Sequence, residues 1–317
     1  MQLTSNTRAF IEAEQYSDFI LLNLHDGLLP DTFYRNVADF MMGDTLHIKT
    51  IGSVTLQETE ENVELIYNPI ESGEITFVIT EYVGDAWYVT DDLREDGTQI
   101  EQLMAARASE HTRAMQERFE TDFLATAAAV YAAAADPFEI NGFAHHVVSA
   151  ESNNIFSLDH LIDMRLAFDK ANVPAAGRIV IVDPVVEATL NKNVSITNDV
   201  TPFAADILAR GLASGQRFFS NWFGWDLMTS NRLYVGAAND GTTSMASGVY
   251  NLFMCILDDQ TKPLMGAWRR QPSVEGERNK DRRRDEFVDS ARYGFGVQRI
   301  DTMGCVVTSV TNTAPAP

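Results

Sequence analysis

Residues 156–184 read FSLDHLIDMRLAFDKANVPAAGRIVIVDP, and this stretch predicts three consecutive elements of an α/β lobe. Ser157 fits the N-cap position of a helix, so we expect a helix over Leu158–Ala171. The continuous apolar run Gly177–Val182 predicts a buried strand. Pro184 then opens a further helix, because proline is tolerated in the first turn.

The same lobe extends over residues 155–265. A Gly- and aromatic-rich loop at 211–223 precedes three segments with strand character, at 224–228, 232–235 and 249–257. Helices and strands therefore share this part of the chain, and the fold class predicted for the whole chain is α+β.

The longest periodic stretch is residues 97–135, where apolar side chains recur at three- and four-residue steps until Pro137. A helix of this length extends about 57 Å. A compact chain of this size has a diameter of about 50 Å. Either the helix kinks or the molecule is flattened and elongated. The Ala-rich half, 125–135, argues against a coiled coil because it lacks large a and d residues.

Strand signals fill residues 44–90, and an acidic hairpin interrupts them. An isolated two-stranded hairpin is marginal in water, so this one either lies on the rest of the chain or reaches a neighbour. Residues 1–43 mix short helical patches with breakers, which suits either an extended arm or an ordinary first helix. The acidic side chains of the hairpin are Glu58, Glu60, Glu61 and Glu64.

Charge is distributed unevenly along the 317 residues, whose formal net charge is −21. Residues 1–120 hold 7 basic and 23 acidic side chains. Because binding to phosphates needs clustered cations, the surface as a whole is unsuited to binding nucleic acid. Residues 268–286 form the one conspicuous basic segment, with seven cations and five acids. Its clustered cations are Arg278, Lys280, Arg282, Arg283 and Arg284. Three interpretations stay open for this cluster: a solvated loop, ion pairing with an acidic neighbouring surface such as the Glu-rich hairpin, and nucleic-acid contact.

Motifs for catalysis, metals and cofactors are missing from the sequence. There is no HExxH, Walker or GxSxG pattern, and His145 and His146 alternate across the backbone. We therefore expect no enzyme activity, no cofactor and no metal site. Cys255 and Cys305 lie in apolar runs and are expected to be buried, which fits a reducing compartment. We also expect neither a signal peptide nor a membrane span.

Several passages share a pattern that is known from one protein family. Gly43–Gly52, GDTLHIKTIG, leads into a loop that returns through the strand Ile75–Tyr82. Phe156–Pro184 combines a helix, NVP, GR and an apolar strand. Gly224–Asn231, GWDLMTSN, and Ala291–Arg299 follow in the same order. Together they resemble the major capsid proteins of tailed double-stranded DNA phages, with the Hong Kong 97-type fold.

The resemblance implies a layout with an N-terminal arm, an extended β-hairpin loop, a peripheral domain with a long spine helix, and an axial domain. These parts correspond to residues 1–43 for the arm, 44–83 for the loop, 84–150 and 266–317 for the peripheral domain, 97–135 for the spine helix and 151–265 for the axial domain.

The resemblance also implies a function: a structural protein that assembles with itself into an icosahedral shell. Many copies, as pentamers and hexamers, would enclose packaged double-stranded DNA without sequence-specific binding. Scaffolding, portal and decoration proteins are the further partners implied. The product would be a virion capsid, assembled in the host cytoplasm and not in a membrane. Contacts between subunits are expected at Lys49, Glu58, Glu60, Glu61, Glu64, Arg278, Arg282, Arg283 and Arg284.

Three alternatives compete with this interpretation. An encapsulin-like compartment has the same fold and encloses a cargo enzyme instead of a genome. An enzyme could use the α/β lobe at 151–265, although that lobe carries no recognisable nucleophile, metal or phosphate motif. A tail or decoration protein would form tubes, trimers or knobs in place of closed shells.

Overall fold

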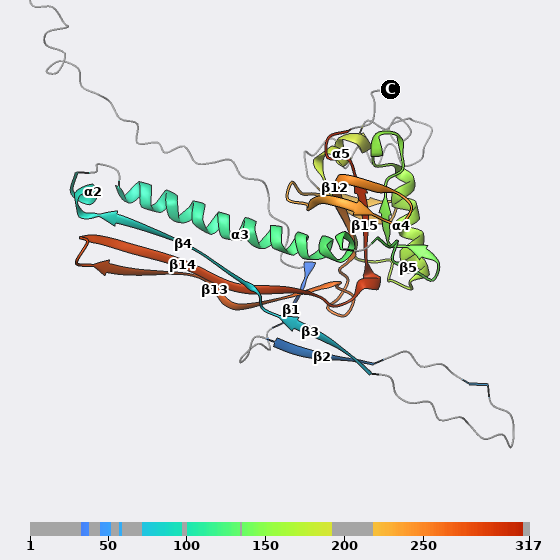
Figure 1. Cartoon of the computed structure of the whole chain (residues 1–317), viewed down its shortest axis with the longest axis horizontal. Coiled ribbons are helices and arrows are strands. Elements are labelled where there is room, and N and C mark those ends of the chain that lie inside the picture. The colour runs from blue at the N-terminus through green and yellow to red at the C-terminus, as the bar shows by residue number, and fades with distance from the viewer. Residues whose placement is uncertain are drawn as a thin grey trace, which may run out of the picture.

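The computed structural model describes residues 33–37, 45–51, 57–58, 72–96, 100–133, 135–191 and 218–312. The described part is elongated, with a lobe of packed helices and strands at one end (Figure 1). A long helix and three long strands run side by side away from this lobe. Of the two alternatives that the helix length left open, the described part therefore shows the elongated molecule.

A four-stranded sheet forms the elongated part, in the order β1-β13-β14-β4. Strands β13, β14 and β4 pair antiparallel, while β1 adds two residues parallel to β13. The elements of this part are β1 (Arg35–Asn36), β4 (Glu81–Thr90), α2 (Asp91–Asp96), α3 (Ile100–Ala132), β13 (Leu264–Asn279) and β14 (Arg284–Val297).

Helix α3 covers one face of this sheet through aromatic contacts. The ring of Phe119 stacks on Trp268 at a centroid distance of 4.5 Å and meets Phe295 edge-on at 4.6 Å. Tyr293 closes the cluster at 4.9 Å from Phe119. The predicted long helix is confirmed over 33 residues. Residues 97–99 of the prediction lie outside the described residues.

The second half of α3 leaves the elongated part and packs into the core of the lobe. Leu124, Ala127, Ala128 and Tyr131 are almost fully buried there, within a cluster that includes residues of β12 and β15. The small alanine side chains let the helix lie close to the sheet. One helix thus connects both sheets, which makes α3 the rigid link between the two parts of the molecule.

The lobe is built on a seven-stranded sheet of order β7-β15-β12-β8-β10-β9, with β11 paired to β12. Its elements are β7 (His146–Val148), α4 (Leu158–Lys170), β8 (Arg178–Val182), α5 (Pro184–Asn191), β9 (Phe218–Trp222), β10 (Trp225–Thr229), β11 (Val235–Asn239), β12 (Ser244–Cys255) and β15 (Met303–Thr308). Short elements accompany them: β5 (Glu139–Ile140), β6 (Phe143–Ala144), η3 (Ser152–Asn154) and η5 (Ile300–Thr302).

The helix–strand–helix unit predicted from residues 156–184 is confirmed. The backbone N–H of Ser157 donates to His160 Nδ1 at 3.1 Å, which fixes the start of α4. All five residues of β8 are buried, as the apolar run predicted. Cys255 and Cys305 are buried and unpaired, also as expected.

A separate two-stranded ribbon carries the predicted loop. Strand β2 (Thr45–Ile51) pairs antiparallel with β3 (Ser72–Val78), and Lys49 lies opposite Glu74. The sequence predicted one strand over Ile75–Tyr82, whereas the structure breaks it at Ile79 and Thr80. Gly294 explains the path, because a Cβ there would lie 2.8 Å from the Ile79 Cα.

The solvated-loop interpretation of the arginine cluster holds for residues 280–283, which form an exposed turn between β13 and β14. Arg278 and Arg284 lie instead near the ends of these two strands. Strand β13 contains Pro272, which cannot donate to a ladder. Its pairing with β14 shifts register between Arg270 and Ser273, the interval that contains this proline.

Candidate assembly surfaces

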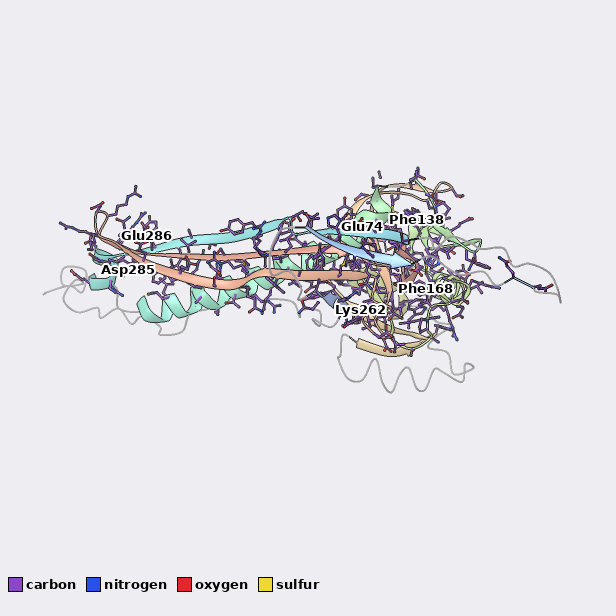
Figure 2. All side chains as sticks on the ribbon, turned by 90° about the horizontal axis from the view of Figure 1, so that it is seen from below. Glu74, Phe138, Phe168, Lys262, Asp285 and Glu286 are labelled. Atoms are coloured by element: carbon purple, nitrogen blue, oxygen red, sulfur yellow. The ribbon has the colours of Figure 1, made fainter. Side chains whose placement is uncertain are left out.

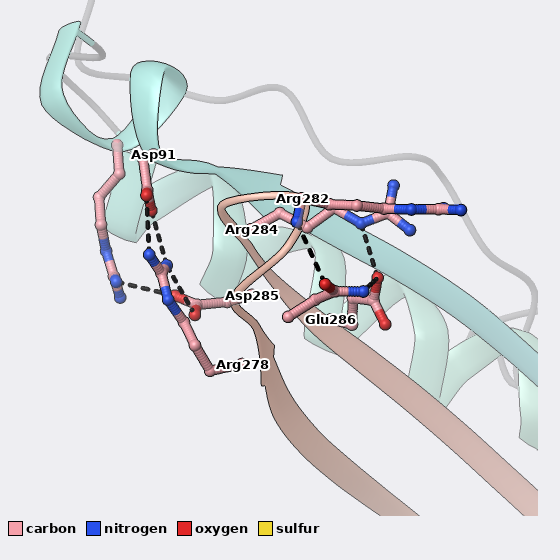
Figure 3. Close-up of polar contacts among 8 residues, drawn as sticks. Asp91, Arg278, Arg282, Arg284, Asp285 and Glu286 are labelled. Carbon is pink, nitrogen blue, oxygen red and sulfur yellow. Dashed lines mark hydrogen bonds and ion pairs between the residues drawn. The ribbon is translucent and has the colours of Figure 1, made fainter.

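The distal end of the β13–β14 hairpin holds a network of charged pairs (Figure 3). Arg278 donates to both carboxylate oxygens of Asp91, at 2.6 and 2.7 Å, and to Asp285 at 3.1 Å. Arg94 donates to the other oxygen of Asp285 at 2.8 Å. A planar guanidinium suits this bidentate geometry. The network ties α2 to the hairpin tip.

Ion pairing shifts the titration of these groups. The hydrogen bonds from Arg278 lower the pKa of Asp91, and the same bonds raise the pKa of Arg278. Bonds from Arg284 and then Asn279 lower the pKa of Glu286. Arg284 also lies over the ring of Tyr88, 4.3 Å from its centroid. Two of the four predicted arginines are thus held by acids of their own chain.

Arg282 and Arg283 behave differently at the tip. Both side chains are exposed, and neither makes a hydrogen bond or ion pair with any residue in the described part of the chain. Their backbone is nevertheless fixed: Arg282 N donates to Asn279 Oδ1 at 3.2 Å, and Asp91 N donates to Arg283 O at 3.1 Å. The tip presents two positive side chains from an ordered turn.

The predicted loop residues lie elsewhere. Lys49 is exposed on β2, and Glu58 is exposed further along the chain. Glu60, Glu61 and Glu64 lie outside the described residues. Within one chain, the β2–β3 ribbon and the hairpin tip lie at opposite ends of the elongated part (Figure 1). The structure therefore does not bring Lys49 together with the arginine cluster.

A second charged network, which the sequence did not predict, joins α3 to the lobe. Ser230 Oγ donates to Glu120 Oε1 at 2.9 Å, while Arg232 pairs with Glu117 at 2.9 Å and lies 3.6 Å from Glu120. Glu120 is only 6% exposed. The helical spacing of Glu117 and Glu120 was visible in the sequence, but their partners lie more than 100 residues away.

The histidines offer structural contacts. His145 Nδ1 lies 3.1 Å from Met303 O, and His146 Nδ1 lies 3.0 Å from Asp136 O. Burial lowers the pKa of both imidazoles.

Among the described residues, no three metal-binding side chains gather at one place, and no helix there is long and apolar enough to cross a membrane.

Comparison with known proteins identifies the fold and the family. Residues 73–308 match a family described as phage capsid protein. The chain belongs to the phage capsid protein family. It has the Hong Kong 97-type fold that the sequence predicted, with both helices and strands. No curated protein matches it.

Solved capsids show the same overall fold at low sequence identity. A chain of Mycobacterium phage Che8 is 17% identical with a TM-score of 0.63, covering 93% of this chain and 97% of that one. The capsid of cyanophage P-SCSP1u is 14% identical with a TM-score of 0.69, covering 96% and 94%. The SrpI encapsulin of Synechococcus elongatus PCC 7942 is 9% identical with a TM-score of 0.60, covering 100% and 99%.

Family membership relates the charged surfaces to assembly. A capsid protein is a structural, shell-forming component of the virion, present in many copies. Such a subunit works through its contacts with other copies of itself. Surfaces with uncompensated charge at opposite ends of one chain are therefore candidates for contacts between subunits.

Proposed function

We propose that pentamers and hexamers of this chain close into an icosahedral shell around a packaged double-stranded DNA phage genome. The family match over residues 73–308 carries this proposal. The chain's excess of acids supports enclosure without sequence-specific binding, because clustered cations are what hold phosphates. Assembly would take place in the host cytoplasm, with scaffolding, portal and decoration proteins as further partners.

We further propose a layout that follows the elements. Residues 1–43 form the arm and 44–83 the extended loop. The peripheral domain comprises 84–150 and 266–317, except that β7 and β15 belong to the sheet of the lobe, and the axial domain comprises 151–265. The pairing of β4 with β14 supports joining the two separate segments of the peripheral domain, because both strands belong to one sheet.

Contacts between subunits are proposed at both charged ends of the chain. On the loop side they are Lys49, Glu58, Glu60, Glu61 and Glu64. On the tip side, Arg282 and Arg283 supply charge to a neighbour, while Arg278 and Arg284 shape the tip through their own acids. A subunit holds several weak contacts at once, and this multivalency stabilises a closed shell.

Electron microscopy of the purified full-length chain tests the proposal, with sedimentation as support. Sixty copies of a 35.3 kDa chain give about 2.1 MDa, the smallest closed icosahedral shell. Round shells of that mass or more are expected. A chain that stays monomeric even when its scaffolding protein is supplied would contradict a shell function.

An encapsulin-like compartment is the second candidate. The SrpI encapsulin aligns over 100% of this chain with a TM-score of 0.60, so the fold alone suits either role. The contents of native particles distinguish the two functions. Nuclease-protected double-stranded DNA supports the phage capsid, whereas a co-purifying cargo enzyme with a docking peptide supports the compartment.

A further inference from the structure

The distal part of α3, residues 103–114, lies along the four-stranded sheet with little buried side chain. Asp285 and Glu286 mark the distal end of this sheet in Figure 2. Among the described side chains of residues 103–114, His111 is the one that is buried. The contact between the distal part of α3 and the sheet therefore depends on the surroundings of a single imidazole.

Two carboxylates enclose this imidazole. Asp85 on β4 lies directly opposite Asp289 on β14, so both side chains project from the same face of the sheet. His111 Nδ1 lies 3.3 Å from Asp85 Oδ2, and His111 Nε2 lies 2.6 Å from Asp289 Oδ2. Like charges directly opposite each other destabilise a sheet. A cation between the two carboxylates relieves this repulsion and joins α3 to both strands.

The further charged group at this place is Arg107, one turn earlier on α3, which pairs with Asp85 at 2.6 Å. Strand β13 contributes the aliphatic Val274 opposite Asp289. Asp289 is only 3% exposed, and its Oδ1 atom makes no hydrogen bond with any described residue. Arg107 thus compensates the partly exposed Asp85, whereas the buried Asp289 relies on His111 within the described part of the chain.

The positions of the two ring nitrogens favour a charged imidazole. A neutral imidazole has one N–H group and one lone pair, whereas an imidazolium has two N–H groups. In the neutral form, one nitrogen lone pair would face a carboxylate oxygen. In the charged form, each N–H faces a carboxylate, and hydrogen bonds between ionised partners are roughly twice as strong as neutral ones. Loss of the proton also leaves a buried carboxylate without a compensating charge, which is strongly unfavourable.

We propose that His111 is a pH switch for the contact between the distal part of α3 and the four-stranded sheet. The protonated imidazole holds α3 on β4 and β14. When the proton is lost as the pH rises, Asp85 and Asp289 repel each other and the distal part of α3 opens more often. The switch acts within one subunit, so it does not depend on the proposed shell function.

The direction of this switch is opposite to that of the buried histidines in the lobe. His145 and His146 are stabilised in the neutral form, because burial disfavours the imidazolium. Raising the pH should therefore loosen the distal part of α3 while the lobe keeps or gains stability. This difference between two parts of one chain distinguishes the switch from a general effect of pH.

Hydrogen exchange measured by mass spectrometry at pH 6.0 and 8.5 tests the switch in the full-length chain. Rates are corrected for the intrinsic pH dependence of exchange, and sedimentation confirms that all samples share one assembly state. Protection of residues 103–114 should fall about tenfold at the higher pH, because the charge-assisted contacts are lost. Residues 123–131 pack into the lobe and serve as the internal control, whose protection should not fall.

Three variants assign the effect to the imidazole. Asp289→Asn keeps the size of the side chain, and its amide N–H can donate to a neutral Nε2, so protection of residues 103–114 should become similar at both pH values. His111→Gln should also remove the pH dependence, with lower protection at pH 6.0. Arg107→Gln is the matched control, because it removes a cation from Asp85 that does not titrate in this range. This control should keep the tenfold fall.

Two results would overturn the proposal. The first is wild-type protection of residues 103–114 that differs by less than twofold between the two pH values. The second is a tenfold fall that persists in both Asp289→Asn and His111→Gln. Neither result bears on whether the chain forms shells, so a failure of the switch and a failure of the proposed function are distinguishable.

Discussion

His145 and His146 are neighbours in the sequence, and both side chains are buried in the fold. Their protonation is therefore linked to folding. Burial lowers both pKa values, so the unfolded chain binds more protons below its ordinary pKa of about 6.5. Stability is therefore complete above that pH and falls as the pH drops. The slope reaches at most about 1.4 kcal/mol per pH unit for each imidazole.

Denaturant unfolding at pH 7.5, 6.5 and 5.5 measures this slope. Replacing both histidines by glutamine should flatten it, even if the variant is less stable at every pH. A wild-type chain whose stability does not change from pH 7.5 to 5.5 would contradict the linkage.

Glu120 is the acidic residue whose loss should matter most for the link between α3 and the lobe. Glu120→Ala removes the acceptor for Ser230 and a charge beside Arg232, so we expect a loss of about 1–3 kcal/mol in unfolding free energy. Glu120→Gln keeps an acceptor oxygen and should cost less. The exposed control Glu139→Gln should stay within about 0.5 kcal/mol. Equal effects at both positions would refute a role for the network.

At the scale of elements, α3 offers a matched test of close packing. Ala127 is fully buried against the lobe, while Ala129, two positions further on, is exposed. Overpacking a core costs about 1–3 kcal/mol, so Ala127→Leu should lower the unfolding midpoint clearly. Ala129→Leu adds the same atoms to the solvent side and should change it little. A similar loss from both variants would mean that the helix propensity of leucine, and not core packing, determines the change in the unfolding midpoint.

Elements with strong local signals were predictable from the sequence. Ser157 at a helix start, the apolar run of β8 and the long periodicity of α3 all act within a few residues of themselves. Most of strand β13 was missed because, beyond its apolar start, it is polar, contains Pro272 and has no second neighbour among the described strands past the two residues that pair with β1, so no alternation is required there.

The candidate site was predictable in composition but not in pairing. The basic segment was visible in the sequence, yet Arg278 finds Asp91 across 187 positions, and only the folded chain brings them together. The pair of Asp85 and Asp289 likewise joins two strands from distant parts of the sequence. Local patterns contain no information on such register.

At the scale of the whole molecule, the shape of one subunit has a measurable consequence. The 33 residues of α3 alone span about 50 Å, the full diameter of a compact chain of this length. A compact globule would have a radius of gyration of about 20 Å. We expect small-angle X-ray scattering of the unassembled subunit to give a clearly larger value. A radius near 20 Å would mean that α3 folds back on the lobe in solution.

Assembly of many such subunits through charged surfaces should depend on ionic strength. Exposed ion pairs are screened within about 10 Å at 0.1 M salt and about 3 Å at 1 M. We expect the concentration at which shells first appear to rise when salt increases from 0.05 to 0.5 M. Light scattering measures this threshold, and the isolated subunit's unfolding midpoint at each salt concentration is the control.

The variant Arg282→Gln/Arg283→Gln makes the salt experiment specific to the tip, because it removes two exposed charges that have no partner among the described residues. If the tip contributes to assembly, this variant should form shells only at a higher protein concentration than the wild type. That threshold concentration should also change less with salt than it does for the wild type. Parallel salt curves for both chains would show that the tip arginines lie outside the contacts. The electrostatic contribution to assembly would then belong to other charged surfaces of the subunit.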